Sequence, residues 1–272
     1  EFLAACERAR IAAKPVVLLH PGRSARARNA VHSHTGALIG DFGAMRTRVE
    51  HDGVLLVDTL DELMDVSEIL VRYPVPPTAG PAVMSASGAF CAITDDFSES
   101  LGLEIPPLAE KTQSLLKGLL PAFGVAKNPL DVTAGNLEGI PGMARALLED
   151  PNTGSLFISY PIDGKIGLQR MRYFLQGTEE SRKPVVIAAL GDTSPVDPEI
   201  YNAAKERGIV FSRSSDRCLR AIALFTAYGR ALQRTRKARN APAPAPFIGL
   251  PALGKGSQPE GLGKRVLAAT GV

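Results

Sequence analysis

The sequence contains no tryptophan and only three cysteines among 272 residues. Cys6, Cys91 and Cys218 lie far apart, are odd in number and form no C-x-x-C pair. This pattern argues against a disulfide framework or a zinc ribbon and predicts reduced thiols in a cytoplasmic protein. No apolar run approaches the ~18 residues of a membrane span, and no signal-peptide pattern opens the chain. We therefore expect a soluble protein with no membrane segment.

The charged residues are few and mixed in sign. They make up 22% of the chain, the net charge is +3, and 45% of the residues are hydrophobic. This composition allows a real core in two domains and does not indicate a nucleic-acid surface. A basic run at 230–239 is the exception, and the Ala/Pro-rich segment that follows it is typical of an extended spacer. We interpret this region as an interdomain linker.

Predicted strands and helices alternate along most of the chain. Lys14-Pro15-Val16-Val17 recurs as Lys183-Pro184-Val185-Val186, and each copy is followed by a loop, a helix, a glycine-led strand and a capped helix. Alternation of this kind predicts parallel sheets with helices on both faces, the doubly wound flavodoxin-like α/β class. The first unit has only two evident strands, so we expect its earlier strands upstream of Glu1.

The pattern divides the chain into five segments. They are a first α/β unit over 1–74, a linker over 75–80, a second flavodoxin-like unit over 81–235, an Ala/Pro-rich linker over 236–257, and a short helical segment over 258–272. Helical spacing begins at Phe2, and the last helix has nothing after it to pack on. We therefore expect a window from a longer polypeptide.

All four histidines, His20, His32, His34 and His51, fall in one stretch. A metal site is one interpretation. However, residues at H-x-H spacing point to opposite sides of an extended segment, and no cysteine or carboxylate set completes a tetrahedron, so we predict no metal site. Ordinary loop and helix-end histidines are the second interpretation.

A nucleophilic histidine is the third interpretation, and it singles out His34. A neutral imidazole with a pKa near ~6.5 is a competent nucleophile at neutral pH. A phosphoryl group on His34 would need donors, which Ser33, Thr35 and the amides around Gly36 can supply. We expect this motif on a tight loop between a strand and a helix.

Two predicted strand-to-helix turns contain glycine. One includes Ser87 and Gly88, and the other includes Asp163 and Gly164. Helix N-termini at such turns direct amides and a positive dipole end toward an anion, and they could together clamp a phosphoryl group. The alternative is that both are ordinary turns in which glycine has only a steric role.

Two further polar groups have open roles. Asn128 and Asp131 lie in a proline-kinked segment, where they either orient a loop or shape a phosphate site. Gly22, Arg23 and Ser24 follow the first strand, and they either bind phosphate or CoA or simply make a turn.

The first unit resembles a known family in several motifs. They are Lys14 to Val17, Gly22-Arg23-Ser24, Ser33 to Leu38, Gly53-Val54 and Val57 to Leu63. Together they resemble the second half of the succinyl-CoA-ligase-like domain of ADP-forming acyl-CoA synthetases, the acetate–CoA ligase family. Asn128 to Thr133 and the second unit resemble the next CoA-ligase domain of that family. The resemblance is collinear over about residues 1–235, and residues 258–272 resemble the entry helix of an ATP-grasp domain.

The resemblance implies that His34 is a phosphohistidine. Acyl-CoA and phosphate would give an acyl phosphate and CoA, the acyl phosphate would phosphorylate His34, and an ATP-grasp domain, in cis or in a partner subunit, would pass the phosphoryl group to ADP. CoA and ATP or ADP with Mg²⁺ are the implied cofactors, a small carboxylic acid or its CoA thioester is the implied substrate, and a homo-oligomer is expected. The glutamate that orients the histidine in this family is not evident here.

Three functions therefore stay open. The first is the ligase itself, with acetate, a branched or aryl acid, or a cinnamate-like acid as substrate. The second is the regulatory region of a protein lysine acetyltransferase, which the presence of His34 disfavours. The third is a non-catalytic nucleotide- or CoA-binding module.

Overall fold

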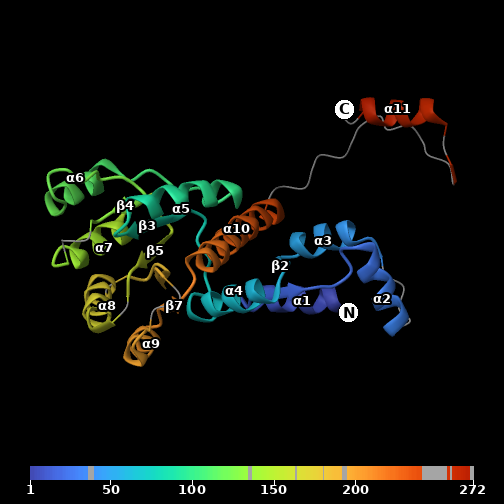
Figure 1. Cartoon of the computed structure of the whole chain (residues 1–272). Helices are drawn as coiled ribbons and strands as arrows, with labels where there is room; N and C mark the ends of the chain where they lie inside the picture. The colour runs from blue at the N-terminus through green and yellow to red at the C-terminus, as the bar shows by residue number, and fades with distance from the viewer. Residues whose placement is uncertain are drawn as a thin grey trace. The chain divides into compact units, whose positions relative to one another are not determined.

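The computed structural model describes residues 1–35, 40–133, 137–162, 164–179, 181–191, 195–240, 256–257 and 259–269. Within these ranges, the side chains of residues 32–35, 164–165, 238–240 and 269 are outside the description. The chain divides into two compact units, Glu1–Thr235 and Arg236–Val272 (Figure 1).

A two-stranded parallel sheet organises the first part of the chain. It pairs β1 (Val16–Leu19) with β2 (Val54–Val57), with Val16 opposite Val54. The helices around it are α1 (Phe2–Ile11), α2 (Ala25–Thr35), α3 (Phe42–His51) and α4 (Leu60–Arg72). The predicted capping box of α4 is present, because the Thr59 hydroxyl accepts from the Glu62 amide and the Glu62 carboxylate accepts from the Thr59 amide.

A five-stranded parallel sheet forms the second part. Its strands are β3 (Pro81–Ser85), β4 (Leu130–Asp131), β5 (Ser155–Tyr160), β6 (Val185–Ala189) and β7 (Val210–Ser212), in the order β4-β3-β5-β6-β7. Numbered along the chain, this is the 2-1-3-4-5 order of flavodoxin-like sheets. The prediction of a doubly wound α/β fold is confirmed.

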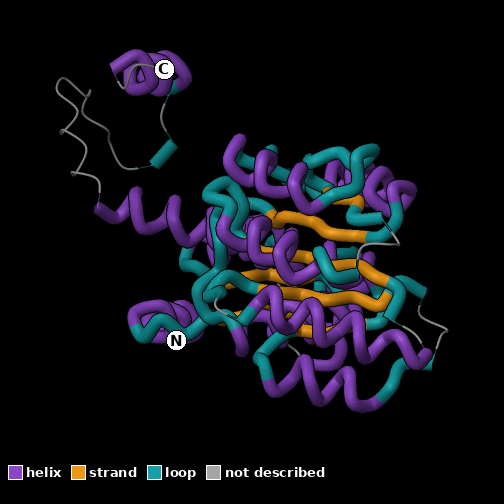
Figure 2. The backbone as a smooth tube through the Cα atoms, turned by 90° about the vertical axis from the view of Figure 1, so that its left-hand side faces the viewer, coloured by secondary structure: helices purple, strands orange, loops and turns teal. Residues whose placement is uncertain are grey.

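Helices cover both faces of this sheet (Figure 2). They are α5 (Gly88–Ser100), α6 (Glu110–Leu119), α7 (Ile140–Glu149), α8 (Gly164–Thr178), α9 (Pro198–Glu206) and α10 (Ser215–Asn240). On one face, Met84 and Ile158 pack with Phe174 of α8. On the other, Val83 and Phe157 pack with α5 and α10. Successive strand residues supply opposite faces, so the central strands β3, β5 and β6 are buried on both sides.

The two sheets share one hydrophobic core. Leu55 of β2 and Val66 and Ile69 of α4 pack in the same cluster as Phe157 of β5 and Phe225 of α10. The Tyr228 hydroxyl of α10 also donates to the carbonyl of Gly53, at 3.0 Å. Residues 1–74 are therefore fastened to residues 81–235 through α4 and α10.

The segment over 75–80, which we predicted to be a linker, is packed against its neighbours. Arg230 of α10 donates to the carbonyl of Thr78 at 2.7 Å. Gly229 of α10 lies so close to the Pro77 carbonyl that a side chain there would collide with it. The segment is thus held in place along α10, while the domain boundaries proposed on either side of it stay a prediction.

The structure corrects the loop predicted around His34. Helix α2 continues to Thr35, so Ser33 and His34 lie in its last turn. The Ala25 to Ala30 segment is rich in alanine and arginine, which favour helix, and the Ser24 hydroxyl accepts from the Ala27 amide at 3.1 Å at its start. The prediction placed too much weight on the hydroxyl residues beside the histidine.

The unit over 236–272 contains the end of α10 and helix α11 (Glu260–Ala269). Lys264 and Glu260 form an ion pair at 2.7 Å along α11. The assignment of this segment to an ATP-grasp domain stays a prediction. In the described part of the chain, every helix is too short or too polar to cross a membrane.

Candidate functional site

The edge of the five-stranded sheet where β3 and β5 end is the candidate site. The chain leaves β3 toward β4 and leaves β5 toward β6, on opposite sides of this point. A crevice outside the carboxyl ends of such strands is where doubly wound folds bind ligands. Helices α5 and α8, which follow β3 and β5, both begin here, as the sequence predicted. Two helix N-termini therefore lie at this edge, where the fold class places its ligand-binding crevice.

Ser87, Gly88 and Asp131 come together at the start of α5. The Ser87 hydroxyl accepts from the Phe90 amide at 3.2 Å, which caps the helix. An ideal Cβ on Gly88 would lie 2.9 Å from Oδ2 of Asp131. The other oxygen of Asp131, Oδ1, accepts from the Thr133 amide at 2.9 Å. A carboxylate thus faces the helix terminus that an incoming anion would use.

Two buried hydroxyls at this edge were missed in the sequence. Ser85 ends β3, in register with Asp131 and Ser159. Its Oγ and the phenol oxygen of Tyr160 are buried, and neither has a hydrogen-bond partner among the described residues. Burial raises the pKa of Tyr160, and its ring meets the Phe174 ring edge-on. The only signal in the sequence was a polar residue ending an otherwise apolar strand.

Asn128 supports the loop and does not face the crevice. Its Oδ1 accepts from the amide of Val83 at 2.8 Å, and its Nδ2 donates to the carbonyls of Pro81 and Pro106. We predicted that Asn128 either orients a loop or shapes a phosphate site, and its contacts match the first role. The side chain joins β3 to the segment that leads into β4.

The remaining predicted residues at this edge are placed only in part. Gly164 is the first residue of α8, while Asp163 and Gly36 lie outside the described residues. His34, with Ser33 and Thr35, ends helix α2, and their side chains also lie outside the description. The structure therefore brings together the starts of α5 and α8, and it leaves the contacts of His34 open.

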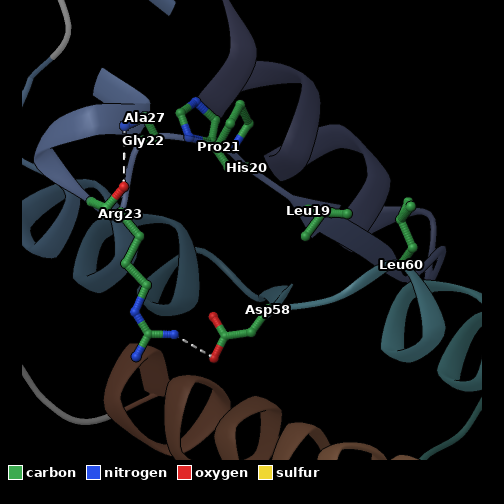
Figure 3. A pocket seen from close by; sticks show the side chains of 9 residues that line it. Leu19, His20, Pro21, Gly22, Arg23, Ala27, Asp58 and Leu60 are labelled. Carbon is green, nitrogen blue, oxygen red and sulfur yellow. Dashed lines mark hydrogen bonds and ion pairs between the residues drawn. The ribbon is translucent and has the colours of Figure 1, made fainter. Parts of the chain in front are cut away.

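Gly22, Arg23 and Ser24 line a cavity of about 710 Å³ at the carboxyl ends of β1 and β2 (Figure 3). Arg23 pairs with Asp58 at 2.9 Å across its mouth, and Ser24 caps α2. Gly22 adopts a φ of 111°, which favours glycine. The rest of the lining is Leu19, His20, Pro21, Ala27 and Leu60. An anion could bind Arg23 here only in competition with Asp58.

No set of three His, Cys, Asp or Glu side chains is grouped as a metal site in the described ranges. His20 follows β1 and His51 ends α3, in different elements. His32 and His34 lie in helix α2 and not in the extended segment assumed from the sequence.

The chain matches known proteins in sequence and in fold. Residues 1–70 match the family described as the succinyl-CoA ligase like flavodoxin domain. The whole chain is 35% identical to trans-feruloyl-CoA synthase from an unknown prokaryotic organism, and it spans 38% of that protein. It is 33% identical, over 53% of its length, to the alpha subunit of ADP-forming acetate–CoA ligase II of Pyrococcus furiosus, of which this match covers 31%.

A solved structure extends the likeness of fold. Acetyl-coenzyme A synthetase 1 of Ca. Korarchaeum cryptofilum, described as dinucleotide forming and solved with phosphate and ADP, aligns with a TM-score of 0.75 at 20% identity. The alignment covers 89% of this chain and 52% of that one. The chain thus spans about half or less of these relatives. Together these matches confirm the resemblance found in the sequence, because the chain is similar in sequence to ADP-forming acyl-CoA ligases and shares the fold of a solved acetyl-coenzyme A synthetase.

Proposed function

We propose that the chain forms the phosphoryl-transfer part of an acid–CoA ligase (ADP-forming). The observation that carries the proposal is the switch point between β3 and β5, where α5 and α8 begin after neighbouring strands and the buried Ser85 hydroxyl has no partner among the described residues. Such a site offers amides, a hydroxyl and two positive dipole ends to a phosphoryl group. One relative is named as a subunit of an ADP-forming acetate–CoA ligase, and that name describes a reaction of the same class.

The proposed reaction has three steps. Phosphate attacks the thioester carbon of acyl-CoA, which releases CoA and forms an acyl phosphate. The imidazole of His34 then takes the phosphoryl group, and the carboxylate leaves as the free acid. ADP finally takes the phosphoryl group from His34 to give ATP, which returns the imidazole to its free form. The reverse direction activates the acid.

The chain's own residues would bind and orient the phosphoryl group. The first-turn amides of α5, at Gly88, and of α8, at Gly164, would donate to its oxygens, and the capping Ser87 would keep α5 in place. Asp131 would hold the loop after β4 through the Thr133 amide and so shape the turn at Gly88. Asp163 would support the start of α8.

The motif at the end of α2 would serve the histidine itself. Ser33, Thr35 and the amide of Gly36 would stabilise the charge on phosphorylated His34. Helix α2 begins at the cavity lined by Gly22, Arg23 and Ser24. We propose that this cavity is a secondary site for CoA or phosphate, beside the main site between β3 and β5.

The nucleotide would bind on an ATP-grasp domain, in cis or in a partner subunit, with Mg²⁺ neutralising its phosphates. The solved protein of similar fold is in complex with phosphate and ADP. The three cysteines are free and buried, which fits a reducing cytoplasm. We also propose a homo-oligomer.

A hydroxycinnamic acid is the substrate class that we propose. The relative matched along the whole of this chain, at 35% identity, is named for trans-feruloyl-CoA. The alpha subunits of acetate ligases I and II of Pyrococcus furiosus match 77% and 53% of the chain, at 27% and 33% identity. Ferulate should therefore be the first acid tested, with acetate as the comparison.

The proposal is tested by labelling the full-length protein with γ-³²P-ATP and Mg²⁺, with an alkaline work-up that preserves phosphohistidine. We expect label on His34, its loss in His34→Ala, and its discharge when ferulate and CoA are added. His51→Ala is the matched control, because His51 is an exposed histidine at the end of α3. Label that survives in His34→Ala would reject the mechanism.

A further inference from the structure

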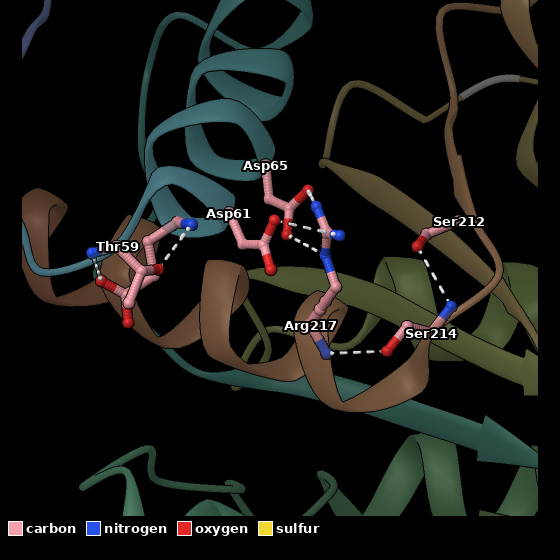
Figure 4. A network of polar contacts seen from close by, with 7 residues as sticks. Thr59, Asp61, Asp65, Ser212, Ser214 and Arg217 are labelled. Carbon is pink, nitrogen blue, oxygen red and sulfur yellow. Dashed lines mark hydrogen bonds and ion pairs between the residues drawn. The ribbon is translucent and has the colours of Figure 1, made fainter.

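A polar network joins α4 to the start of α10 (Figure 4). The Arg217 guanidinium makes two hydrogen bonds to Asp65, at 2.8 and 2.7 Å, and lies 3.2 Å from Asp61. One arginine therefore holds two carboxylates from successive turns of α4. Asp65 raises the pKa of Arg217 further, so the guanidinium keeps its charge. Arg220, one turn later on α10, lies 3.9 Å from Glu62.

The α4 end of the network reaches the first sheet. Glu62 accepts from the amide of Asp58 at 2.7 Å and from the amide of Thr59 at 3.2 Å. Asp58 directly follows β2, and its carboxylate pairs with Arg23 at the cavity from which α2 starts. The first turn of α4 is therefore tied to the carboxyl edge of the two-stranded sheet.

The α10 end of the network reaches the second sheet. The amide of Arg217 donates to the Ser214 hydroxyl, and the Ser214 amide donates to the Ser212 hydroxyl at the end of β7. The hydroxyls of Ser215 and Ser159 are 2.8 Å apart, and Ser159 is the register partner of Ser85. Arg217 thus stands between the carboxyl edges of the two sheets.

Hydrophobic contacts surround the network on both helices. Leu63 and Val66 of α4 and Cys218 and Leu219 of α10 pack in the cluster that also contains Ile69, Leu70, Phe225 and Tyr228. This cluster holds the two helices together. The guanidinium adds a directional contact at the sheet edge, because its planar fork binds Asp65 in one orientation.

We propose that Arg217 is a positioning residue, which holds the carboxyl edge of the two-stranded sheet, with helix α2, in a fixed relation to the crevice between β3 and β5. The inference rests on the proposed function and deepens it. It assigns Arg217 to the half-reaction in which the phosphoryl group moves between His34 and the acid. The exchange with nucleotide, on another domain, does not depend on it.

The test compares the two half-reactions in the full-length protein. Arg217→Ala should be labelled by γ-³²P-ATP at the parent rate, whereas ferulate and CoA should discharge the label at least tenfold more slowly. In steady state, kcat for acyl-CoA formation should fall while kcat/KM for ATP stays unchanged, because ATP reacts only in the labelling half-reaction. Arg217→Lys should recover part of the discharge rate, because one ammonium can meet one carboxylate at a time.

Arg207→Ala is the matched control. Arg207 forms an exposed ion pair with Glu179 at 2.6 Å, at the far side of the five-stranded sheet from α4. The Arg207→Ala variant should leave the rates of both half-reactions unchanged. If Arg217→Ala unfolds, Asp65→Asn removes the same bidentate contact from the other helix and should slow discharge equally.

Two results would overturn the inference, and they differ from a failure of the proposed function. Discharge within twofold of the parent in both Arg217→Ala and Asp65→Asn would reject the positioning role while leaving the phosphohistidine intact. Equal losses of labelling and discharge would also reject it, because they would indicate a general structural effect. A parent protein that takes no label on His34 would reject the proposed function itself, and this inference with it.

Discussion

The Asp131 carboxylate faces the first turn of α5 so closely that a Cβ on Gly88 would lie 2.9 Å from its Oδ2. The Asp131 side chain cannot rotate away freely, because its other oxygen, Oδ1, accepts a hydrogen bond from the Thr133 amide at 2.9 Å. The absence of a side chain at residue 88 is therefore what allows the strand end and the helix start to meet. This contact joins two residues that the sequence singled out separately.

Gly88→Ala should consequently disturb the crevice more than the fold. The added methyl group displaces Asp131 or the α5 terminus, and such a shift slows discharge of labelled His34 by roughly 10- to 100-fold. The unfolding free energy should fall by only about 1 to 3 kcal/mol. Quench-flow discharge and urea unfolding measure the two effects.

Gly118→Ala is the control for Gly88→Ala. Gly118 lies inside α6, and a Cβ there would meet nothing within 4 Å. This variant should gain up to about 1 kcal/mol of stability from helix propensity and keep the parent discharge rate. A Gly88→Ala protein that discharges its label as fast as Gly118→Ala would contradict the importance of the contact.

Much of the fold could be predicted from the sequence, because local signals and tertiary packing agree. Lys14-Pro15 and Lys183-Pro184 each precede a strand, and Thr59 with Glu62 marks the start of α4. The parallel strands with helices on both faces followed from the alternation of strands and helices. Strand β4 gave no such signal, because it contains only Leu130 and Asp131.

The candidate site was predictable only in part. Ser87 and Gly88 carry the glycine-turn pattern, and the structure places them at the sheet edge as expected. Ser85 carries no pattern, since its importance comes from burial without a hydrogen-bond partner among the described residues. Arg217 is one arginine in a basic helix, and only the fold brings it to Asp65, which lies far away in sequence.

Asn128→Ala should destabilise the protein strongly. The side chain satisfies the Val83 amide and two carbonyls, and alanine would leave these buried groups without partners. We expect the unfolding free energy to fall by about 2 to 4 kcal/mol. Asn152→Ala is a milder comparison, because the Asn152 amide group makes one exposed hydrogen bond, to the Pro107 carbonyl. Equal losses in the two variants would count against a structural role for Asn128.

The Arg23–Asp58 ion pair should control anion binding at the cavity beside β1. Asp58→Asn frees Arg23, so inorganic phosphate and CoA should bind several-fold more tightly at low salt, and the gain should fade as salt screens the charge. Arg23→Ala should abolish the gain. Because the pair is largely exposed, stability should change by less than about 1 kcal/mol.

Glu50→Gln serves as the control for Asp58→Asn, since Glu50 pairs with Arg46 at 2.8 Å on α3 with similar exposure. Calorimetric titration of each variant with phosphate and with CoA gives the comparison. Equal affinity in the parent, Asp58→Asn and Arg23→Ala would show that this cavity binds neither ligand.

Cys91, one turn into α5, should make stability depend on alkaline pH. Burial, together with the nearby Asp131 carboxylate, raises the pKa of its thiol from 9.0 to about 11. Between these values the unfolded chain loses the proton while the folded chain keeps it, so the unfolding free energy falls as pH rises from about 9 to 11. Below pH 9 the thiol is protonated in both states and adds no slope.

Cys91→Ala should therefore flatten the pH dependence over that window without removing it, because burial also raises the pKa of Cys218, to about 12. Urea unfolding at several pH values, for the parent and for each single cysteine variant, measures the difference. At pH 8 both thiols should react with a disulfide reagent far more slowly in the folded protein than in urea. Rapid labelling of Cys91 in the folded protein would mean that the start of α5 opens readily, which is incompatible with a crevice whose amides are held ready for an anion.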